Sequence, residues 1–565
     1  MAYCQWLVRL ACCVVMATLA GAAVAHTATS EHSMIATVDP IATDAGVDVF
    51  REGGNAVDAA VTAALTLGVV NGENSGIGGG CLILIRTADG KFTAIDGREM
   101  APGAANRDMF VRDGKPMPRA SQTGPLASGV PGALAAYKLA LERCGTVRLP
   151  RALAPGIKAA AEGFEVSKSY SSAVRSVENS LREFDGSREV FFRDGKPIGA
   201  GDHLVQVDLA NTYRQIAEHG ADYFYRGELA KRIGDWMAHN GGIMTAEDFA
   251  NYEAKIREPL RSTYRGHEII GFPPPSSGGV HVAQVLNILE NFDIRAIAKD
   301  DPIKASHITA EAFKLAFADR AYWLGDADFV SVPRGLTDKG YAKELAAKID
   351  PDKAMEVPGH GSPPNYAQDV FGRHTTHIAA ADAAGNWVAI TATVNTTFGS
   401  KVIVPGTGVV LNDEMDDFSI YPGQPNAFGL VGAENNSVAP GKRPLSSMSP
   451  TIVLDPHGKP VLTVGAAGGP KIITQVILTI MRVLDFQQSL PEAVEARRIH
   501  HQWRPNAVSY EKGLDEKVVE GLRKRGHNVE ELESGGRTQS IGIDAAGKLV
   551  GVADPRTVDG KAAGN

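Results

Sequence analysis

The pattern of apolar and polar positions divides the chain into a mixed first part, a helical middle and a strand-rich end. In the first part, Asn55 follows two glycines and precedes apolar residues at helical spacing. It is therefore the expected N-cap of a helix that extends through Leu67. A glycine-rich loop, Asn71 to Gly80, comes next. The strands expected here are 35–38 and the hairpin pair 81–85 and 91–96.

Between about Pro131 and Asp350, apolar side chains at helical spacing predict a mostly helical region. The helices expected in it are 133–143, 208–219, 228–239, 280–292, 304–324 and 341–349. A run of glycines and prolines from Gly271 to Gly279 interrupts them and predicts a rigid turn. The segment 351–369, rich in Pro, Gly and Asp, is the best candidate for a connector.

Strand patterns dominate after Thr375. The strands expected there are 376–380, 387–394, 401–404, 408–412, 451–454 and 460–464. The first two should pair as a hairpin around the turn 382–386. Two helices follow, Ile472–Leu484 and Pro491–Ile499. Helices, two runs of strands and more helices predict an α+β fold in which helical layers surround sheets.

Composition excludes some classes of function. The chain has 565 residues, 44% hydrophobic and 22% charged, which is typical of a globular protein with a large core. Its net charge of -8 argues against a nucleic-acid partner, because phosphate binding needs a basic face. Of the cysteines, only Cys81 and Cys144 lie beyond the first 25 residues, and the sequence leaves open whether they pair.

The first 25 residues have the pattern of a signal peptide. Arg9 precedes an apolar run, and Ala23-Val24-Ala25 matches a cleavage site. The run is short for a membrane anchor, and no other segment reaches spanning length. We therefore expect residues 1–25 to be removed and the mature chain, without a membrane span, to be periplasmic or extracellular.

The Thr-Thr pair at 375–376 has two interpretations. Such a pair at the head of a strand is usually only two β-branched residues on a pleated surface. If the bond between His374 and Thr375 is cut, however, Thr375 gains an α-amine with a pKa of about 7.7–8.0. This amine is a suitable base for its own hydroxyl. The same hydroxyl can first attack the carbonyl of His374, which would let the chain cleave itself.

Two further stretches suggest a binding site. Gly465–Lys471 joins a strand to a helix; it lacks the Gly-Lys-Ser/Thr of a P-loop, and it is either a turn of small residues or an oxyanion hole. Asn412–Phe418 is acidic and is either a solvated loop or, together with Arg98 and the hydroxyls of Ser446-Ser447, a pocket for a zwitterion.

No metal or other cofactor is expected. The histidine pairs 374/377 and 500/501 lack the helical His-x-x-x-His spacing with a supporting carboxylate that a zinc site needs.

Taken together, the motifs resemble the γ-glutamyltransferase (glutathione hydrolase) family of N-terminal-nucleophile hydrolases. The similarity covers nearly the whole chain after the signal peptide. It rests on Gly53–Ala60, Asn74–Gly80, Arg98–Pro102, Pro273–Gly279, Thr375–His377, Asn395–Gly399, Asn412–Phe418, Lys442–Pro450, Gly468-Gly469, His500–Trp503 and Asp554–Arg556.

The resemblance implies a four-layer αββα sandwich and self-cleavage into a large subunit, 26–374, and a small subunit, 375–565. It implies that Thr375 attacks the γ-glutamyl amide of glutathione and its conjugates. The resulting γ-glutamyl ester is passed to water, an amino acid or a peptide. The implied residue roles are support of the nucleophile by Thr393, oxyanion donation by Gly468 and Gly469, binding of the glutamyl carboxylate by Arg98, Ser446 and Ser447, and binding of its amine by Asn395, Glu414 and Asp417.

Three positions qualify the resemblance. Bacterial relatives often carry Gln where this chain has Glu414, and an extra carboxylate should strengthen recognition of an ammonium group. Relatives that cleave glutaryl-cephalosporins depart from Asp at the position of Asp417, so its presence favours γ-glutamyl donors. Phe428 occupies the aromatic gate of the lid, 421–429, but lacks the hydroxyl of a Tyr.

Two alternatives stay open at this stage: a glutaryl-cephalosporin acylase, and an unprocessed protein that binds γ-glutamyl compounds. An uncut chain should place Thr375 near Gly468 and Gly469.

Overall fold

The computed structural model describes residues 26–364, 377–532 and 535–565. The expected signal peptide, the pair His374–Thr375 and the expected position of Thr375 near the two glycines lie outside the described residues. Within those residues, no helix is both long enough and apolar enough to cross a membrane.

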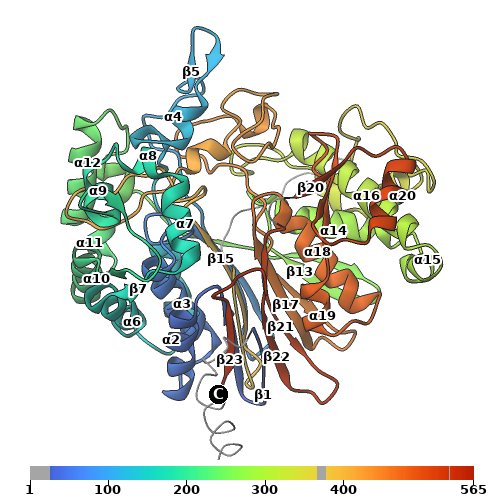
Figure 1. Ribbon diagram of the computed structural model, residues 1–565, viewed down its shortest axis with the longest axis horizontal. Coiled ribbons are helices and arrows are strands. Elements are labelled where there is room, and N and C mark those ends of the chain that lie inside the picture. Colours follow the sequence, from blue (N-terminus) through green and yellow to red (C-terminus); the bar gives the residue numbers. More distant parts are fainter. Residues whose placement is uncertain (1–25, 365–376, 533–534) are drawn as a thin grey trace, which may run out of the picture.

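Two seven-stranded antiparallel sheets lie at the centre of the fold, with helices on the outer face of each (Figure 1). The first sheet has the order β11 (Lys255–Arg257), β4 (Phe92–Gly97), β3 (Gly80–Arg86), β15 (Trp387–Thr393), β14 (His377–Asp382), β2 (Ser33–Thr37) and β23 (Lys561–Gly564). The second has the order β1 (Thr27–Ser30), β22 (Leu549–Ala553), β21 (Arg537–Ile543), β17 (Pro460–Ala467), β16 (Thr451–Leu454), β13 (His267–Gly271) and β12 (Leu260–Tyr264). The αββα sandwich is confirmed.

Each outer layer has its own hydrophobic core. The helices packed on the first sheet include α2 (Pro40–Arg51), α3 (Ala56–Val70), α5 (Ala133–Cys144), α6 (Leu149–Glu162) and α10 (Val207–His219). Those on the second include α14 (Ser277–Leu289), α16 (Pro302–Trp323), α18 (Lys471–Leu484) and α19 (Leu490–Glu495). As expected, Asn55 caps α3: its side chain accepts from the backbone N–H groups of Val57 and Asp58.

A third core lies between the sheets. In β3, Leu82 and Leu84 point into it, whereas Cys81, Ile83 and Ile85 belong to the core beneath the helices. This alternation is the period of two that a strand imposes on its side chains. Because both faces of β3 are covered, the strand has a continuous apolar run in the sequence. The structure also answers the question about the cysteines, because Cys81 and Cys144 are both free.

Some predicted elements are wrong. The strands expected at 401–404 and 408–412 are reduced to an isolated bridge between Ile403 and Val410, because Lys401, Gly406 and Gly408 have positive φ. The helix expected at Pro491–Ile499 runs from Leu490 to Glu495, and a later helix, α20 (Glu516–Lys524), was not predicted. The middle of the chain contains the strands β11, β12 and β13, which helical periodicity did not predict. These strands are three to five residues long, and β13 finds its second partner, β16, far along the chain.

The glycine-rich loop 78–80 allows two backbones to approach closely. A Cβ on Gly79 would lie 1.8 Å from the carbonyl oxygen of Thr393, and one on Gly78 would lie 2.1 Å from that of Val410. No side chain fits in this space. The loop therefore fixes the end of β15, where Thr393 lies.

We predict that Gly79→Ala lowers the free energy of unfolding by about 3 kcal/mol or prevents folding, because overpacking against backbone cannot be relieved by a rotamer change. Chemical denaturation measures this change in the free energy of unfolding. Gly359→Ala is the matched control, since a Cβ there has nothing within 4 Å. Equal stability of the two variants would contradict the close approach.

Candidate active site

Strands from both sheets end at one place. In the first sheet, β15 ends at Thr393 and β14 begins at His377. In the second, β17 ends at Ala467, and a Cβ on Gly465 would lie 2.2 Å from Nδ1 of His377. The head of β14 therefore packs against the last residues of β17. Thr375 precedes the first described residue of β14 by two positions in the sequence.

Gly468 and Gly469 form the turn between β17 and α18. Their φ angles are +134° and +58°, and residues other than glycine adopt such positive values only with strain. The ring of Phe428 lies over this turn: a Cβ on Gly469 would be 2.8 Å from its Cδ1. Gln502 donates to the carbonyl of Phe428 at 3.2 Å. The lid residue named from the sequence thus covers the predicted oxyanion turn.

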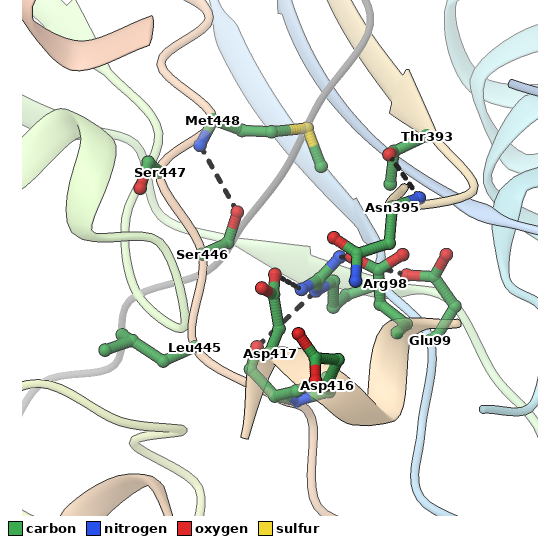
Figure 2. A network of polar contacts seen from close by, with 12 residues as sticks. Arg98, Glu99, Thr393, Asn395, Asp416, Asp417, Leu445, Ser446, Ser447 and Met448 are labelled. Atoms are coloured by element: carbon green, nitrogen blue, oxygen red, sulfur yellow. Dashed lines mark hydrogen bonds and ion pairs between the residues drawn. The ribbon is translucent and has the colours of Figure 1, made fainter. Parts of the chain in front are cut away.

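Thr393 and Asn395 are held beside each other. The Oγ1 of Thr393 accepts from the backbone N–H of Asn395 at 2.7 Å. Asn395 itself has a φ of +79°, and its amide donates to the carbonyl of Asp413 at 3.0 Å. These contacts orient both side chains next to the acidic segment, and Figure 2 shows them facing the same space as Arg98.

Arg98 is fully buried and surrounded by carboxylates (Figure 2). Its guanidinium donates to Oε1 of Glu414, to Oδ2 of Asp417 at 2.8 Å, and to Oε2 of Glu99 at 3.3 Å. Glu414 and Asp417 come from a short 3-10 helix, Glu414–Asp417, whereas Arg98 follows β4. The fold thus brings three residues predicted for the pocket into direct contact. Glu99 is a fourth member; it lies within the motif Arg98–Pro102, but no role was predicted for it.

The cluster contains more acidic than basic groups. Burial raises the pKa of Glu99 to about 7 and that of Glu414 well above its usual range, while Arg98 opposes both shifts. One oxygen of Glu99 and one of Glu414 accept from no donor group of another described residue, although the two carboxyls interact with each other. An ammonium group that entered this space would supply the missing positive charge and the missing donors.

Ser446 and Ser447 lie on the loop that precedes β16; the side chain of Ser446 is on the side of the cluster, and that of Ser447 is on the other side of the loop (Figure 2). The backbone N–H of Ser277 donates to the carbonyl of Ser446 at 3.0 Å. Arg320 donates to Oγ of Ser447 at 3.4 Å and to Oγ of Ser277 at 3.0 Å. Burial lowers the pKa of Arg320 to about 10. This arginine of α16 was missed from the sequence, because no local motif marks it.

The described residues contain one group of potential metal ligands, and it is elsewhere. His307, Glu311 and His527 are buried with ligand atoms within 4.8 Å of one another. The histidines share a hydrogen bond of 2.7 Å between Nδ1 of His307 and Nε2 of His527. Lys314 donates to Glu311 at 2.7 Å. The ammonium of Lys314 therefore already supplies a positive charge to the carboxylate.

Comparisons with known proteins agree with this geometry. A family model described as gamma-glutamyltranspeptidase matches residues 42–564. The chain belongs to the gamma-glutamyltranspeptidase family. It is 44% identical over 542 residues to the "Glutathione hydrolase proenzyme" of Escherichia coli (strain K12), covering 95% of this chain and 93% of that protein.

Two solved structures resemble this family member. The crystal structure of cephalosporin acylase from Bacillus halodurans has a TM-score of 0.85 at 28% identity, covering 95% of this chain and 97% of the other. The crystal structure of Helicobacter pylori gamma-glutamyltranspeptidase has a TM-score of 0.55 at 42% identity, covering 56% and 91%. Because one of these structures is an acylase, the fold alone does not determine the donor substrate, and the residues of the pocket must be considered.

We predict that Arg98→Met lowers the free energy of unfolding by about 3–5 kcal/mol at pH 8.5, because it leaves buried carboxylates without their counter-ion. The loss should be smaller at pH 5.5. Glu99 and Glu414 have raised pKa values and become neutral as the pH falls, which removes the uncompensated charge. Urea denaturation at both pH values measures this. An equal loss at both would contradict the charge assignment.

Proposed function

We propose that this protein is a self-processing γ-glutamyl hydrolase and transpeptidase that acts on glutathione and its conjugates. The observation that carries the proposal is the buried Arg98–Glu414–Asp417 cluster, whose acidic segment is hydrogen-bonded through Asp413 to Asn395, two residues beyond the end of β15. It supplies positive and negative charge side by side. That combination suits the α-carboxylate and the α-ammonium of a glutamyl group. Membership of the gamma-glutamyltranspeptidase family supports the same conclusion.

The reaction begins with cleavage of the chain between His374 and Thr375, which frees the α-amine of Thr375. This amine takes the proton of the Thr375 hydroxyl, and the oxygen attacks the γ-carbonyl carbon of the donor. The N–H groups of Gly468 and Gly469 stabilise the oxyanion. The C–N bond breaks, the amine leaves with a proton, and a γ-glutamyl ester remains. Water or an acceptor amine then attacks the ester and restores the hydroxyl.

Each pocket residue has a role in holding the donor. Ser446, Ser447 and Arg98 bind the glutamyl carboxylate, with Arg320 holding Ser447 in place. Asn395, Glu414 and Asp417 bind the ammonium. Thr393 supports the nucleophile, because it is the last residue of β15, and β15 pairs with β14, the strand that begins two residues after Thr375.

Processing gives a large subunit, 26–374, and a small subunit, 375–565, which stay together. The expected signal peptide directs the protein across the inner membrane, so it acts in the periplasm or outside the cell. There it meets extracytoplasmic glutathione and peptides.

We predict that the purified protein migrates as two bands on a denaturing gel and releases p-nitroaniline from γ-glutamyl-p-nitroanilide. Thr375→Ala should give one full-length band and no release. A wild-type sample that is cleaved but inactive would refute the enzymatic proposal. A full-length wild type that binds γ-glutamyl compounds without turnover would instead support the alternative of a binding protein.

The second candidate is an acylase for glutaryl-cephalosporins, favoured by the likeness to the Bacillus halodurans structure. A glutaryl group has no ammonium, so it gains nothing from the carboxylate of Asp417. We predict that kcat/KM is higher for γ-glutamyl than for glutaryl donors. Asp417→Asn should lower the γ-glutamyl value about 10- to 100-fold, the cost of losing a charged hydrogen bond, and the glutaryl value much less.

Asp113→Asn is the control for this substitution, because Asp113 is exposed. Higher activity on the glutaryl donor in the wild type, or equal losses for both donors in Asp417→Asn, would contradict the assignment.

A further inference from the structure

A second cavity lies beside the same strand ends, on the opposite flank of β14 from the Arg98 cluster. In the first sheet, Arg98 follows β4 and the second cavity adjoins β2, with β3, β15 and β14 between them. In the second sheet, Ser446 and Ser447 precede β16, whereas Arg537 begins β21 and pairs with Ala467 at the end of β17. The Arg98 cluster and the second cavity thus flank the place where β14 meets β17.

The second cavity is an open cleft that narrows to a pit. The cleft has a volume of about 800 Å³ and is bounded by α7 (Lys168–Ser176) and the start of α2. The cleft and the pit share the lining residues Asp39, Val70, Ser167, Ser169 and Asp559, so they are continuous. The pit adds Glu73, Asn74, Ala467 and Arg537. Ala467 immediately precedes the Gly468–Gly469 turn, and the backbone N–H of Val394 donates to the carbonyl of Asn74 at 3.1 Å.

The pit contains a carboxyl group that is not satisfied by the protein. Glu73 is 4% exposed; its Oε1 accepts from the amide of Asn71 at 2.8 Å, while its Oε2 has no partner among the described residues. Burial raises the pKa of Glu73 to about 8. Leaving a buried polar atom unpaired costs about 1–3 kcal/mol, so a ligand that donates to it is favoured.

The pit also contains a positive charge. The side chain of Arg537 lines it, is partly exposed, and lies close enough to Glu73 to lower its pKa in opposition to burial. Asp39 and Asp559 lie close enough to raise it. A basic group and acidic groups are thus presented together to a cleft that is open to solvent.

We propose that the cleft, together with the pit of Glu73 and Arg537 at its end, is the acceptor site, which binds an α-amino acid or dipeptide through its free carboxylate and its α-amine. Arg537 pairs with the carboxylate, and Glu73 receives the amine. The leaving part of glutathione, a dipeptide with the same two groups, occupies the same cleft in the first half of the reaction. This inference rests on the proposed function.

The chemistry of transfer fits a carboxyl group of this kind. The acceptor arrives as an ammonium ion, which cannot attack, and gives one proton to the carboxylate of Glu73. The free amine nitrogen then attacks the ester carbonyl carbon, forming a C–N bond. The C–O bond to Thr375 breaks, and a second amine proton passes to the Thr375 oxygen. Glu73 returns its proton to solvent, so one amide forms, one ester is lost and the enzyme is unchanged.

The test compares two acceptors that differ only at the carboxyl end, glycylglycine and glycylglycinamide, with γ-glutamyl-p-nitroanilide as donor. In the wild type, glycylglycine should have the lower acceptor KM, by about tenfold or more, as a charged hydrogen bond predicts. In Arg537→Gln this preference should disappear, and Arg537→Lys should restore part of it. Because the ratio is taken within each variant, a general loss of activity cancels.

Two further variants complete the test. Glu73→Gln should lower the maximal rate of transfer to both acceptors, since it removes the base. Arg112→Gln, on the exposed strand β5 (Val111–Arg112), should match the wild type. An Arg537→Gln enzyme that keeps the wild-type preference for glycylglycine would overturn the acceptor site while the proposed function stands. A processed wild type that releases no p-nitroaniline would overturn both.

Discussion

The structure depends on a buried positive charge that is neutralised by residues far away in the sequence. Arg98 is fully buried, and its carboxylate partners Glu414 and Asp417 lie more than 300 positions further along the chain. An arginine without partners in this place would destabilise the protein by several kcal/mol. The end of β4 and the 3-10 helix must therefore meet correctly for the chain to fold. In doing so they build a pocket with charges of both signs.

The same long-range pairing runs through both sheets. In the first sheet, β14 and β15 lie between β2 and β3, and in the second, β13 pairs with β16. Each sheet thus contains strands from before and after residue 374. A cut after His374 removes one covalent bond but no strand pairing, so two subunits would remain a single folded unit. The proposed processing would therefore free the α-amine of Thr375 without loss of the fold.

Much of the fold was predictable from local patterns, and most of what was missed arises from long-range contacts. Asn55 predicted the start of α3 correctly, because capping depends on residues close in sequence. The helix 228–239 has the bounds that periodicity predicted. The strands β12 and β13 are short and take their stability from β16, so their sequence carries little signal. Motifs in the sequence marked Arg98, Glu414 and Asp417. Arg320, Glu73 and Arg537 were not predicted, because only the folded chain brings Arg320 to Ser447 and places Glu73 and Arg537 in one cavity.

The central claim is that Thr375 becomes the N-terminal residue of the small subunit and carries the γ-glutamyl group. Intact mass spectrometry, after rapid acid quenching with an excess of donor, tests it most directly. The account predicts a chain that begins at Thr375 and gains the mass of one glutamyl group, located by peptide mapping on that residue. A glutamyl group on any other residue, or a small subunit with a different first residue, would contradict it.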